Sequence, residues 1–218
     1  MGRALGRGFY ARSSVAVARD ALGRVLVMRA RGRVIAGRIV ETEAYGGARD
    51  PASHAFRGRT ARNASMFGPP GAAYVYFTYG MHHCLNLVTG AEGRASAVLV
   101  RAIEPLAGAV HMRRSRGAIG RRLPDSRLAR GPGNVARALG VTLAHDGLDL
   151  TRGRLWISNR PRERQGRRVA SGPRIGIGPA RERAWRFHLE GNPCVSGPRP
   201  RAAAAATGTR RRARQVRH

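Results

Sequence analysis

Two carboxylates and a phenol follow one another at alternate positions in the segment IVETEAY, as Glu41, Glu43 and Tyr45. Side chains at alternate positions of a β-strand project to one face, so these three residues and Ile39 are expected to share a face. A carboxylate beside an aromatic ring could act as a general base next to a platform for a flat ligand. The alternative is that the strand leaves the core at Glu41 and that both acids are solvated or paired with arginines.

Tyrosines gather in the segment AAYVYFTYGMHHCLN, which holds Tyr74, Tyr76 and Tyr79 beside two histidines and an asparagine. Tyr74 and Tyr76 share one face of the expected strand, and Tyr79 ends it before Gly80, where the backbone can turn sharply. The rings could pack in the core with Tyr79 at an edge, or one ring could stack on a planar ligand while Tyr79 protrudes. Aromatic rings on an arginine-rich surface are typical of proteins that stack nucleic acid bases.

Other polar residues define what chemistry is expected. Arg101 stands in the otherwise apolar segment VLVRAIEP and should face a carboxylate or a cleft, because arginine is rarely buried without a partner. The histidines and cysteines do not have the spacing of a zinc site, so no metal is expected. The segment RIGIGP lacks the third glycine of a dinucleotide-binding fingerprint, and no cofactor is expected.

The charge balance indicates a polyanionic partner. The chain of 218 residues has 41 basic and 12 acidic residues, a formal net charge of +29, and every basic residue is arginine. Such a surface favours nucleic acid, with an acidic membrane surface as the lesser alternative. Without lysine, a Schiff base could form only at the α-amino terminus. The chain shows no apolar run of membrane-span or signal-peptide length and no disulfide framework, which predicts a cytoplasmic protein with reduced cysteines.

The pattern of the chain predicts short elements around a sheet. Helices are expected at 13–22, about 106–116 and 133–140, and strands at 24–29, 33–45, 72–79, 83–90 and 95–105, the last ended by Pro105. A hairpin at 148–159 and short strands in RIGIG and WRFHLE are also expected, with a long loop at 46–72. The predicted class is α+β: one domain, 1–198, with a curved, mainly antiparallel, open-barrel-like sheet among short helices and long loops. Residues 199–218 are expected to be a basic, disordered tail.

Taken in order, these segments resemble the alkyladenine (3-methyladenine) DNA glycosylase family. The motifs that carry the resemblance are RIVETEAYGG, SHAFRGRTARNASMF, YVYFTYGMHHCLN, VLVRAIEPLAG, GPGNVARALG and RIGIGPA with WRFHLEGNPCVS, over roughly residues 10 to 198. The resemblance implies a monofunctional enzyme of base excision repair. It would flip alkylated or deaminated purines out of double-stranded DNA and hydrolyse the N-glycosidic bond, leaving an abasic site. A water nucleophile agrees with the absence of lysine, and a monomer is expected because one lesion needs one pocket.

The resemblance also implies roles for the polar residues. Glu43 matches the glutamate that orients and deprotonates the attacking water, and Arg101 matches an arginine that helps to hold it. The spacing alone does not choose between Glu41 and Glu43. One departure is Asn134, which stands where the family often has lysine and puts one phosphate or structural contact in doubt.

Further matches concern the pocket for the extruded base. Tyr45, His54 and Tyr76 match the residues that sandwich the base, and Asn86 matches an asparagine at the pocket floor that disfavours the amine of guanine. Tyr79 matches the side chain that enters the duplex, and Ile177 lies in the backbone segment that approaches the water and the sugar. No residue is an obvious acid for neutral lesions.

The alternative function is a non-catalytic, basic nucleic-acid-binding module, and a small ribosome-associated protein is a weaker one. Such a module would explain the charge and the aromatic rings. It gives no reason for a carboxylate at Glu43 beside Tyr45.

Overall fold

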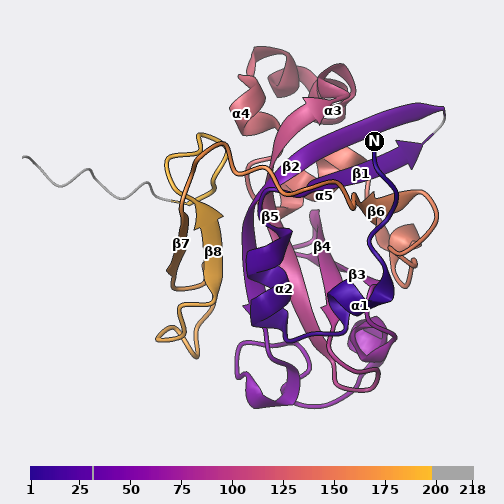
Figure 1. Ribbon diagram of the computed structural model, residues 1–218, viewed down its shortest axis with the longest axis vertical. Helices are drawn as coiled ribbons and strands as arrows, with labels where there is room; N and C mark the ends of the chain where they lie inside the picture. Colours follow the sequence, from indigo (N-terminus) through magenta and orange to yellow (C-terminus); the bar gives the residue numbers. More distant parts are fainter. Residues whose placement is uncertain (31, 198–218) are drawn as a thin grey trace, which may run out of the picture.

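The computed structural model describes residues 1–30 and 32–197, and eight strands of this part form one sheet (Figure 1). The strands are β1 (Val25–Ala30), β2 (Arg33–Tyr45), β3 (Ala73–Thr78), β4 (His82–Thr89), β5 (Ser96–Ala107), β6 (Leu155–Ile157), β7 (Val169–Gly172) and β8 (Arg186–Leu189). The order is β3-β4-β5-β2-β1-β6, and β8 joins β2 to β7, with every pairing antiparallel. The sheet does not close on itself. The predicted α+β class with an open, mainly antiparallel sheet is therefore confirmed.

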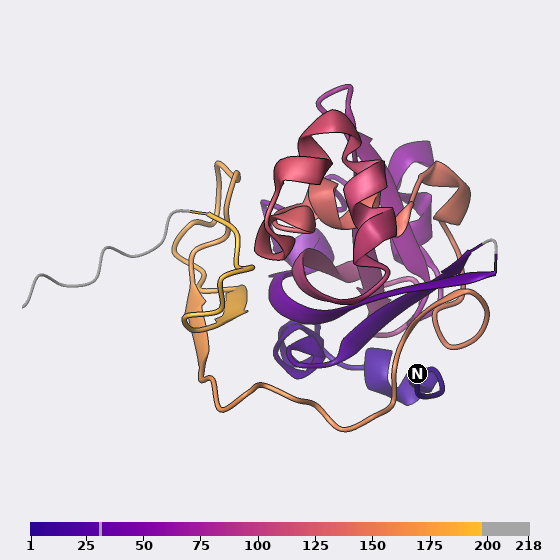
Figure 2. The same cartoon turned by 90° about the horizontal axis from the view of Figure 1, so that it is seen from above.

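Short helices cover both faces of the sheet (Figure 2). They are α1 (Arg7–Tyr10) and α2 (Ser14–Ala21) on one face, and α3 (Ala109–Ser115), α4 (Asp125–Leu128) and α5 (Pro132–Leu139) on the other. α2 begins where the hydroxyl of Ser13 accepts the amide of Ala16, and α5 ends at Gly140 in the left-handed region. Within the described ranges, no helix is long and apolar enough to cross a bilayer.

β2 is the strand around which the site is built. β1 pairs with its first half and β8 with residues 41–43, both on one edge, while β5 runs along the other edge. The register between β2 and β5 shifts three times. Val40 is an extra residue on β2, and Arg101 and Leu106 are extra residues on β5. Such bulges bend a strand and re-aim its side chains, and they place the guanidinium of Arg101 beside the second half of β2.

The bulge at Val40 also changes the predicted alternation along β2. Ile39 packs in the main hydrophobic core together with Val40, so it does not share the face of Glu41. Beyond the bulge the alternation returns: Thr42 points toward α2, where its hydroxyl donates to the carbonyl of Ala18 at 2.9 Å. The prediction of one shared face is therefore wrong at Ile39.

Three predictions about elements are wrong in other ways. The segment 148–159 is not a hairpin, because residues after Leu148 form turns around Asp149 and only Leu155–Ile157 is a strand, paired with β1. RIGIG is not a strand, since Gly176 has a φ of +76°. β5 continues past Pro105 to Ala107, because beyond Leu99 its strand partner is β2 alone and a proline is tolerated beside an unpaired edge.

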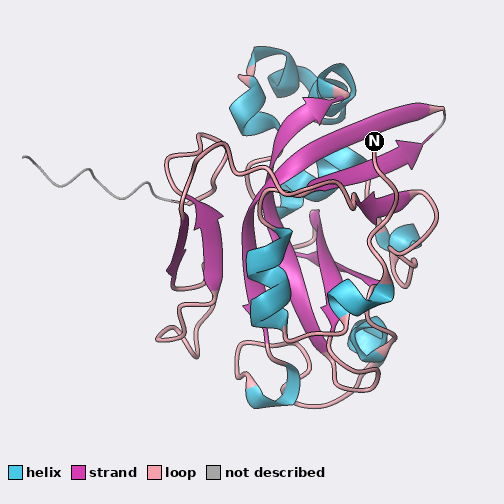
Figure 3. Cartoon of the chain, viewed as in Figure 1, coloured by secondary structure: helices cyan, strands magenta, loops and turns pink. Residues whose placement is uncertain are grey.

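The remaining differences concern loops and the chain's end. The expected long loop at 46–72 contains the 3-10 segments Gly47–Arg49 and Ala61–Phe67, and others lie at Gly117–Arg122 and Leu143–His145 (Figure 3). Cys84 and Cys194 are buried and do not form a disulfide. The predicted tail, 199–218, lies outside the described residues.

Candidate active site

A cavity of about 660 Å³ opens between the strands β3, β4 and β5, the loop after β2, the start of α5 and the segment 175–179. This volume lies in the usual range of pockets for small molecules. Its lining includes every residue that the sequence singled out for the site except Glu43: Tyr45, His54, Tyr76, Tyr79, Asn86, Arg101 and Ile177. Residues that are far apart in the chain thus meet around one cavity.

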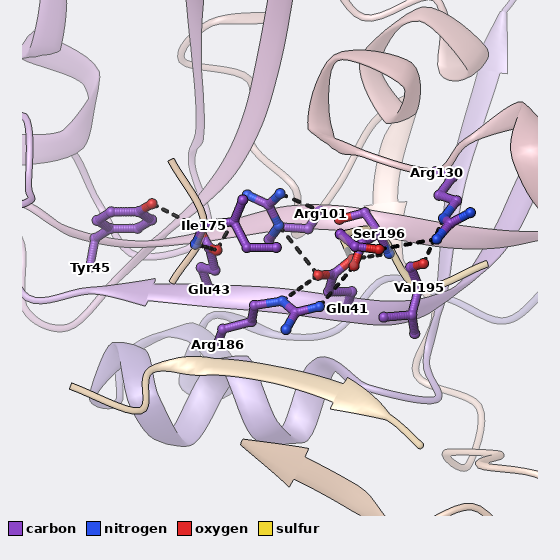
Figure 4. Close-up of polar contacts among 10 residues, drawn as sticks. Glu41, Glu43, Tyr45, Arg101, Arg130, Ile175, Arg186, Val195 and Ser196 are labelled. Carbon is purple, nitrogen blue, oxygen red and sulfur yellow. Dashed lines mark hydrogen bonds and ion pairs between the residues drawn. The ribbon is translucent and has the colours of Figure 1, made fainter. Parts of the chain in front are cut away.

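Glu43 does not line the cavity and has no exposed surface, but it contacts three residues that do, Tyr45, Arg101 and Ile175 (Figure 4). Its Oε2 accepts the hydroxyl of Tyr45 at 2.8 Å, and its Oε1 accepts the amide of Ile175 at 2.7 Å. Nη1 of Arg101 is 3.3 Å from the same Oε1. Burial, with the adjoining carboxylate, raises the pKa of Tyr45, so the phenol remains the donor in its contact with Glu43.

Glu41 is equally buried, but its partners differ. Its Oε1 accepts Nε of Arg186 at 2.6 Å and lies 3.4 Å from Nε of Arg101, and its Oε2 accepts the amide of Ser196 at 2.7 Å. The sequence left open whether these acids pair with arginines, and Glu41 does so on both sides. Arg101 faces both a carboxylate and a cleft, since it contacts Glu41 and Glu43 and also lines the cavity.

Aromatic rings form one wall of the cavity. Nδ1 of His54 and the hydroxyl of Tyr74 are 2.8 Å apart, and the ring centroids of His54 and Tyr76 are 4.5 Å apart at a steep angle. Tyr74 is buried in a small core cluster, whereas Tyr76 is partly exposed to the cavity. Burial raises the pKa of both tyrosines. Asn86 is buried and donates from Nδ2 to the carbonyl of Tyr74 at 3.1 Å.

The turn between β3 and β4, residues 79–81, carries Tyr79 away from the protein. Tyr79 is 81% exposed, and it has a φ of +51°, followed by Gly80 at +64°. The amide of Met81 closes the turn on the carbonyl of Thr78 at 3.2 Å. A left-handed conformation costs a residue with a Cβ about 1–2 kcal/mol. The tight turn imposes that conformation and leaves the ring at the rim of the cavity.

Two residues that the sequence interpretation missed hold this site together. Arg174 and Asp50 are both fully buried and form a two-pronged ion pair, with Nη1 2.5 Å from Oδ2 and Nη2 2.8 Å from Oδ1. Nη1 also donates to the carbonyl of Ala44 at 2.9 Å, and the guanidinium lies 4.8 Å from the ring centroid of Tyr45. The pair therefore fixes the loop after β2 against the segment that supplies the amide of Ile175.

A signal for Arg174 was present in the sequence. It stands beside alternating isoleucines and glycines in RIGIG, so the argument that was applied to Arg101 applies to it as well. Its partner was not predictable, since Asp50 is 124 positions away. Burial alone would raise the pKa of Asp50, but the hydrogen bonds from Arg174 outweigh it and hold that pKa below its usual value.

Comparisons with known proteins point to one family. The family model described as methylpurine-DNA glycosylase (MPG) matches residues 8–193. A protein of Anaeromyxobacter dehalogenans is 48% identical over 205 residues, with 92% of this chain and 89% of that protein covered. A protein of Rhodopseudomonas palustris is 48% identical, with 91% and 93% covered, and one of Burkholderia cenocepacia is 46% identical, with 89% and 92% covered. All three bear the name "Putative 3-methyladenine DNA glycosylase". The chain belongs to the methylpurine-DNA glycosylase family.

Proposed function

We propose that this protein is a monofunctional DNA glycosylase, which releases alkylated or deaminated purines from duplex DNA and leaves an abasic site. The observation that carries the proposal is the buried carboxylate of Glu43, held by Tyr45 and Ile175, two residues that line the aromatic cavity. Membership of the family and the names of the relatives support the same reaction.

Entry of the base is the first step. A base in a duplex hides its glycosidic bond, so the nucleotide must swing out of the helix at a cost of a few kcal/mol. Tyr45, His54 and Tyr76 would hold the extruded base, since stacking on an aromatic ring contributes about 1–3 kcal/mol per base. A methylated purine that carries positive charge gains further from the electron-rich ring faces. The amide group of Asn86 would disfavour the amine of an ordinary guanine at the pocket floor. In 7-methylguanine the attraction of the cation to the ring faces would offset this penalty.

Tyr79 would fill the gap that the nucleotide leaves. Its exposed ring at the rim of the cavity suits insertion into the base stack, where it would replace part of the lost stacking. The arginine-rich surface would bind the phosphates and make affinity depend strongly on salt.

The chemical step follows from the surroundings of Glu43. Hydrolysis at C1′ passes through a state that resembles an oxocarbenium ion, which a nearby carboxylate stabilises. As a general base, Glu43 would also take a proton from the attacking water, with Arg101 and the backbone around Ile177 helping to position that water. Because Tyr45 covers Oε2 in the free protein, we infer that its hydroxyl yields this oxygen to water when a base enters.

The leaving group decides which lesions react fastest. A cationic 3- or 7-methylpurine departs without protonation, whereas a neutral base such as hypoxanthine needs a proton donor. The proposal therefore expects faster release of the cationic bases. Because the chain has no lysine, water is the expected nucleophile and no strand cleavage should accompany base release.

The test uses duplexes that carry one 7-methylguanine or one hypoxanthine, incubated with the protein and then heated in alkali. Strand scission that depends on alkali supports a monofunctional glycosylase. Scission without alkali would contradict the monofunctional mechanism. No scission of either duplex by a folded preparation would refute the proposed function and favour the nucleic-acid-binding module.

A further inference from the structure

Glu41, the second buried carboxylate, has no part in the reaction as described. It lies two residues before Glu43 on β2, and both acids contact Arg101 (Figure 4). Oε1 of Glu41 is 3.4 Å from Nε of Arg101, and Oε1 of Glu43 is 3.3 Å from its Nη1. Burial of a charge is costly unless it is paired and hydrogen-bonded, and Glu41 meets that condition through Arg186 and the amide of Ser196. Neither of these two partners lines the cavity, whereas Oε2 of Glu43 is covered by the cavity-lining Tyr45, whose hydroxyl can yield to water. Glu41 is therefore less suited than Glu43 to activate water.

One partner of Glu41, the amide of Ser196, lies in the last part of the described chain, the segment 194–197. Arg130 donates to the carbonyls of Val195 and Gly197 at 2.7 and 3.2 Å. Arg186 donates from Nη2 to the carbonyl of Ser196 at 2.8 Å. The segment 194–197 is therefore tied to α4–α5, to β8 and to β2 at once, directly behind Arg101.

These contacts restrict how Arg101 can be oriented. Its Nε lies 3.4 Å from Oε1 of Glu41, an ion-pair contact without a hydrogen bond. Its Nη2 donates to the hydroxyl of Ser196 at 3.3 Å, and its Nη1 faces Glu43 at 3.3 Å. A guanidinium without these restraints prefers a two-pronged pair with a carboxylate. Such a pair with Glu43 would occupy the oxygens that must accept the water proton.

We propose that Glu41 is a positioning residue that, together with Ser196, holds Arg101 in a one-pronged contact with Glu43 and so keeps the Glu43 carboxylate available to water. The inference rests on the proposed function, and on the role of Glu43 within it. It assigns to the segment 194–197 a part in the active site, although none of its residues lines the cavity.

The test compares single-turnover base release and lesion affinity in Glu41→Gln, with a duplex that carries one 7-methylguanine. A misplaced Arg101 should slow release from the saturated complex by about 10- to 100-fold, since small errors of position are costly in catalysis. The Kd for the lesion duplex should change by less than about 3-fold, because Glu41 does not line the cavity. A role in folding alone would not produce this split between rate and affinity.

Glu104→Gln is the matched control. Glu104 lies on β5 opposite Arg38 of β2, a buried arginine to which it is bound at 2.5 Å. This pair and Arg101 lie on opposite sides of the bulge at Val40. Its substitution should lower stability while leaving the rate of base release within about 2-fold of wild type. A loss of rate in Glu104→Gln equal to that in Glu41→Gln would overturn the proposal.

The route through Arg101 is tested by the double variant Glu41→Gln/Arg101→Gln. If Glu41 acts through Arg101, the double variant releases the base no more slowly than Arg101→Gln alone. Additive losses would show that Glu41 acts by another route and would overturn the proposal.

Ser196→Ala provides a second measurement if Glu41→Gln does not fold. It removes only the hydroxyl contact to Nη2 of Arg101 and should slow release by about 3- to 10-fold, the size expected of one hydrogen bond. An unchanged rate would overturn the proposal. Wild type and Glu43→Gln are measured in the same series to separate the proposed glycosylase function from the positioning role of Glu41. An inactive wild type refutes the function. An active wild type with an equally fast Glu41→Gln refutes only the positioning role.

Discussion

Two parts of the site differ in almost every physical respect. The acid–arginine cluster, formed by Glu41, Glu43 and Arg101, is buried, and each acid is bound by arginine and by a backbone amide. The hairpin tip, residues 79–81, carries a tyrosine that is 81% exposed and has left-handed backbone. The acid–arginine cluster is held in place by tertiary contacts, whereas the conformation of the hairpin tip is fixed by the geometry of a tight turn.

The difference suggests a division of labour. Groups that must stabilise charge in a reaction work best when they are fixed in advance in a site without bulk water. A side chain that must enter DNA works best when it is already outside the protein and has few contacts to lose. We therefore expect substitutions in the acid–arginine cluster to alter the rate of base release, and substitutions at the hairpin tip to alter the affinity for lesion DNA.

The largest effect is expected for Glu43→Gln. The amide cannot take a proton from water, so single-turnover base release should fall by about 100- to 10,000-fold. The Kd for lesion DNA should stay close to that of wild type, as measured by fluorescence anisotropy. If Glu43→Gln releases the base normally and Glu41→Gln does not, the two carboxylates have been assigned the wrong way round.

The largest loss of stability is expected for Asp50→Asn, which breaks the buried ion pair of Asp50 with Arg174. Loss of one partner leaves Arg174 buried and uncompensated, which typically lowers the free energy of unfolding by about 3–5 kcal/mol. Denaturant unfolding measures this loss. Asp125→Asn, in an exposed pair with Arg113, is the control and should cost about 1 kcal/mol or less.

The stability difference at Asp50 should also depend on pH. Because the folded-state pKa of Asp50 lies below its usual value, the contribution of the pair is fully present above the unfolded pKa of about 4. It is lost as the pH falls below that value toward the folded-state pKa. The gap between wild type and Asp50→Asn should thus narrow on acidification, and a gap that widens would contradict the assignment.

A smaller effect, of a different kind, is expected at the tip. Tyr79→Ser should weaken binding of lesion DNA by about 10-fold, since one stacked ring is lost. A 2-aminopurine beside the lesion reports extrusion through its fluorescence, which should rise less in this variant than in wild type. Val110→Ser, at a comparably exposed apolar residue on α3, should leave both signals unchanged.

The smallest effect is expected for Tyr45→Phe. The ring that would stack on the base is retained, and only the hydroxyl that covers Oε2 of Glu43 is removed. Both the rate and the Kd should stay within about 3-fold of wild type. A loss of rate as large as that of Glu43→Gln would show that the Tyr45 hydroxyl itself takes part in the chemistry.

Much of the fold was predictable where the signal was local. The alternation in β2 after the Val40 bulge, the two halves of the β3–β4 hairpin and helix α2 depend on neighbouring residues, and these elements lie close to where they were predicted. The hairpin expected at 148–159 was wrong because two short apolar runs do not show which partner each will find. Leu155–Ile157 pairs with β1 instead.

The candidate site was predictable as a set of residues but not as a geometry. The sequence selected Tyr45, Tyr76 and Arg101, and the structure brings them to one cavity, while their roles stay proposals. The bulge at Arg101, the amide of Ile175 and the pair of Arg174 with Asp50 depend on contacts between distant segments. No local spacing encodes such contacts.

The pairing of β8 with β2 has a consequence for synthesis. Glu41 and Glu43 leave the ribosome early, but Ile175, Arg186 and Ser196, which complete their hydrogen bonds, are made more than 130 residues later. A nascent or prematurely ended chain could already carry the aromatic segments and much of the positive charge, while Glu41 and Glu43 still lack these hydrogen-bond partners. The carboxylates proposed for the reaction would then be held in place only after Ser196 has been made, later than the segments proposed to bind nucleic acid.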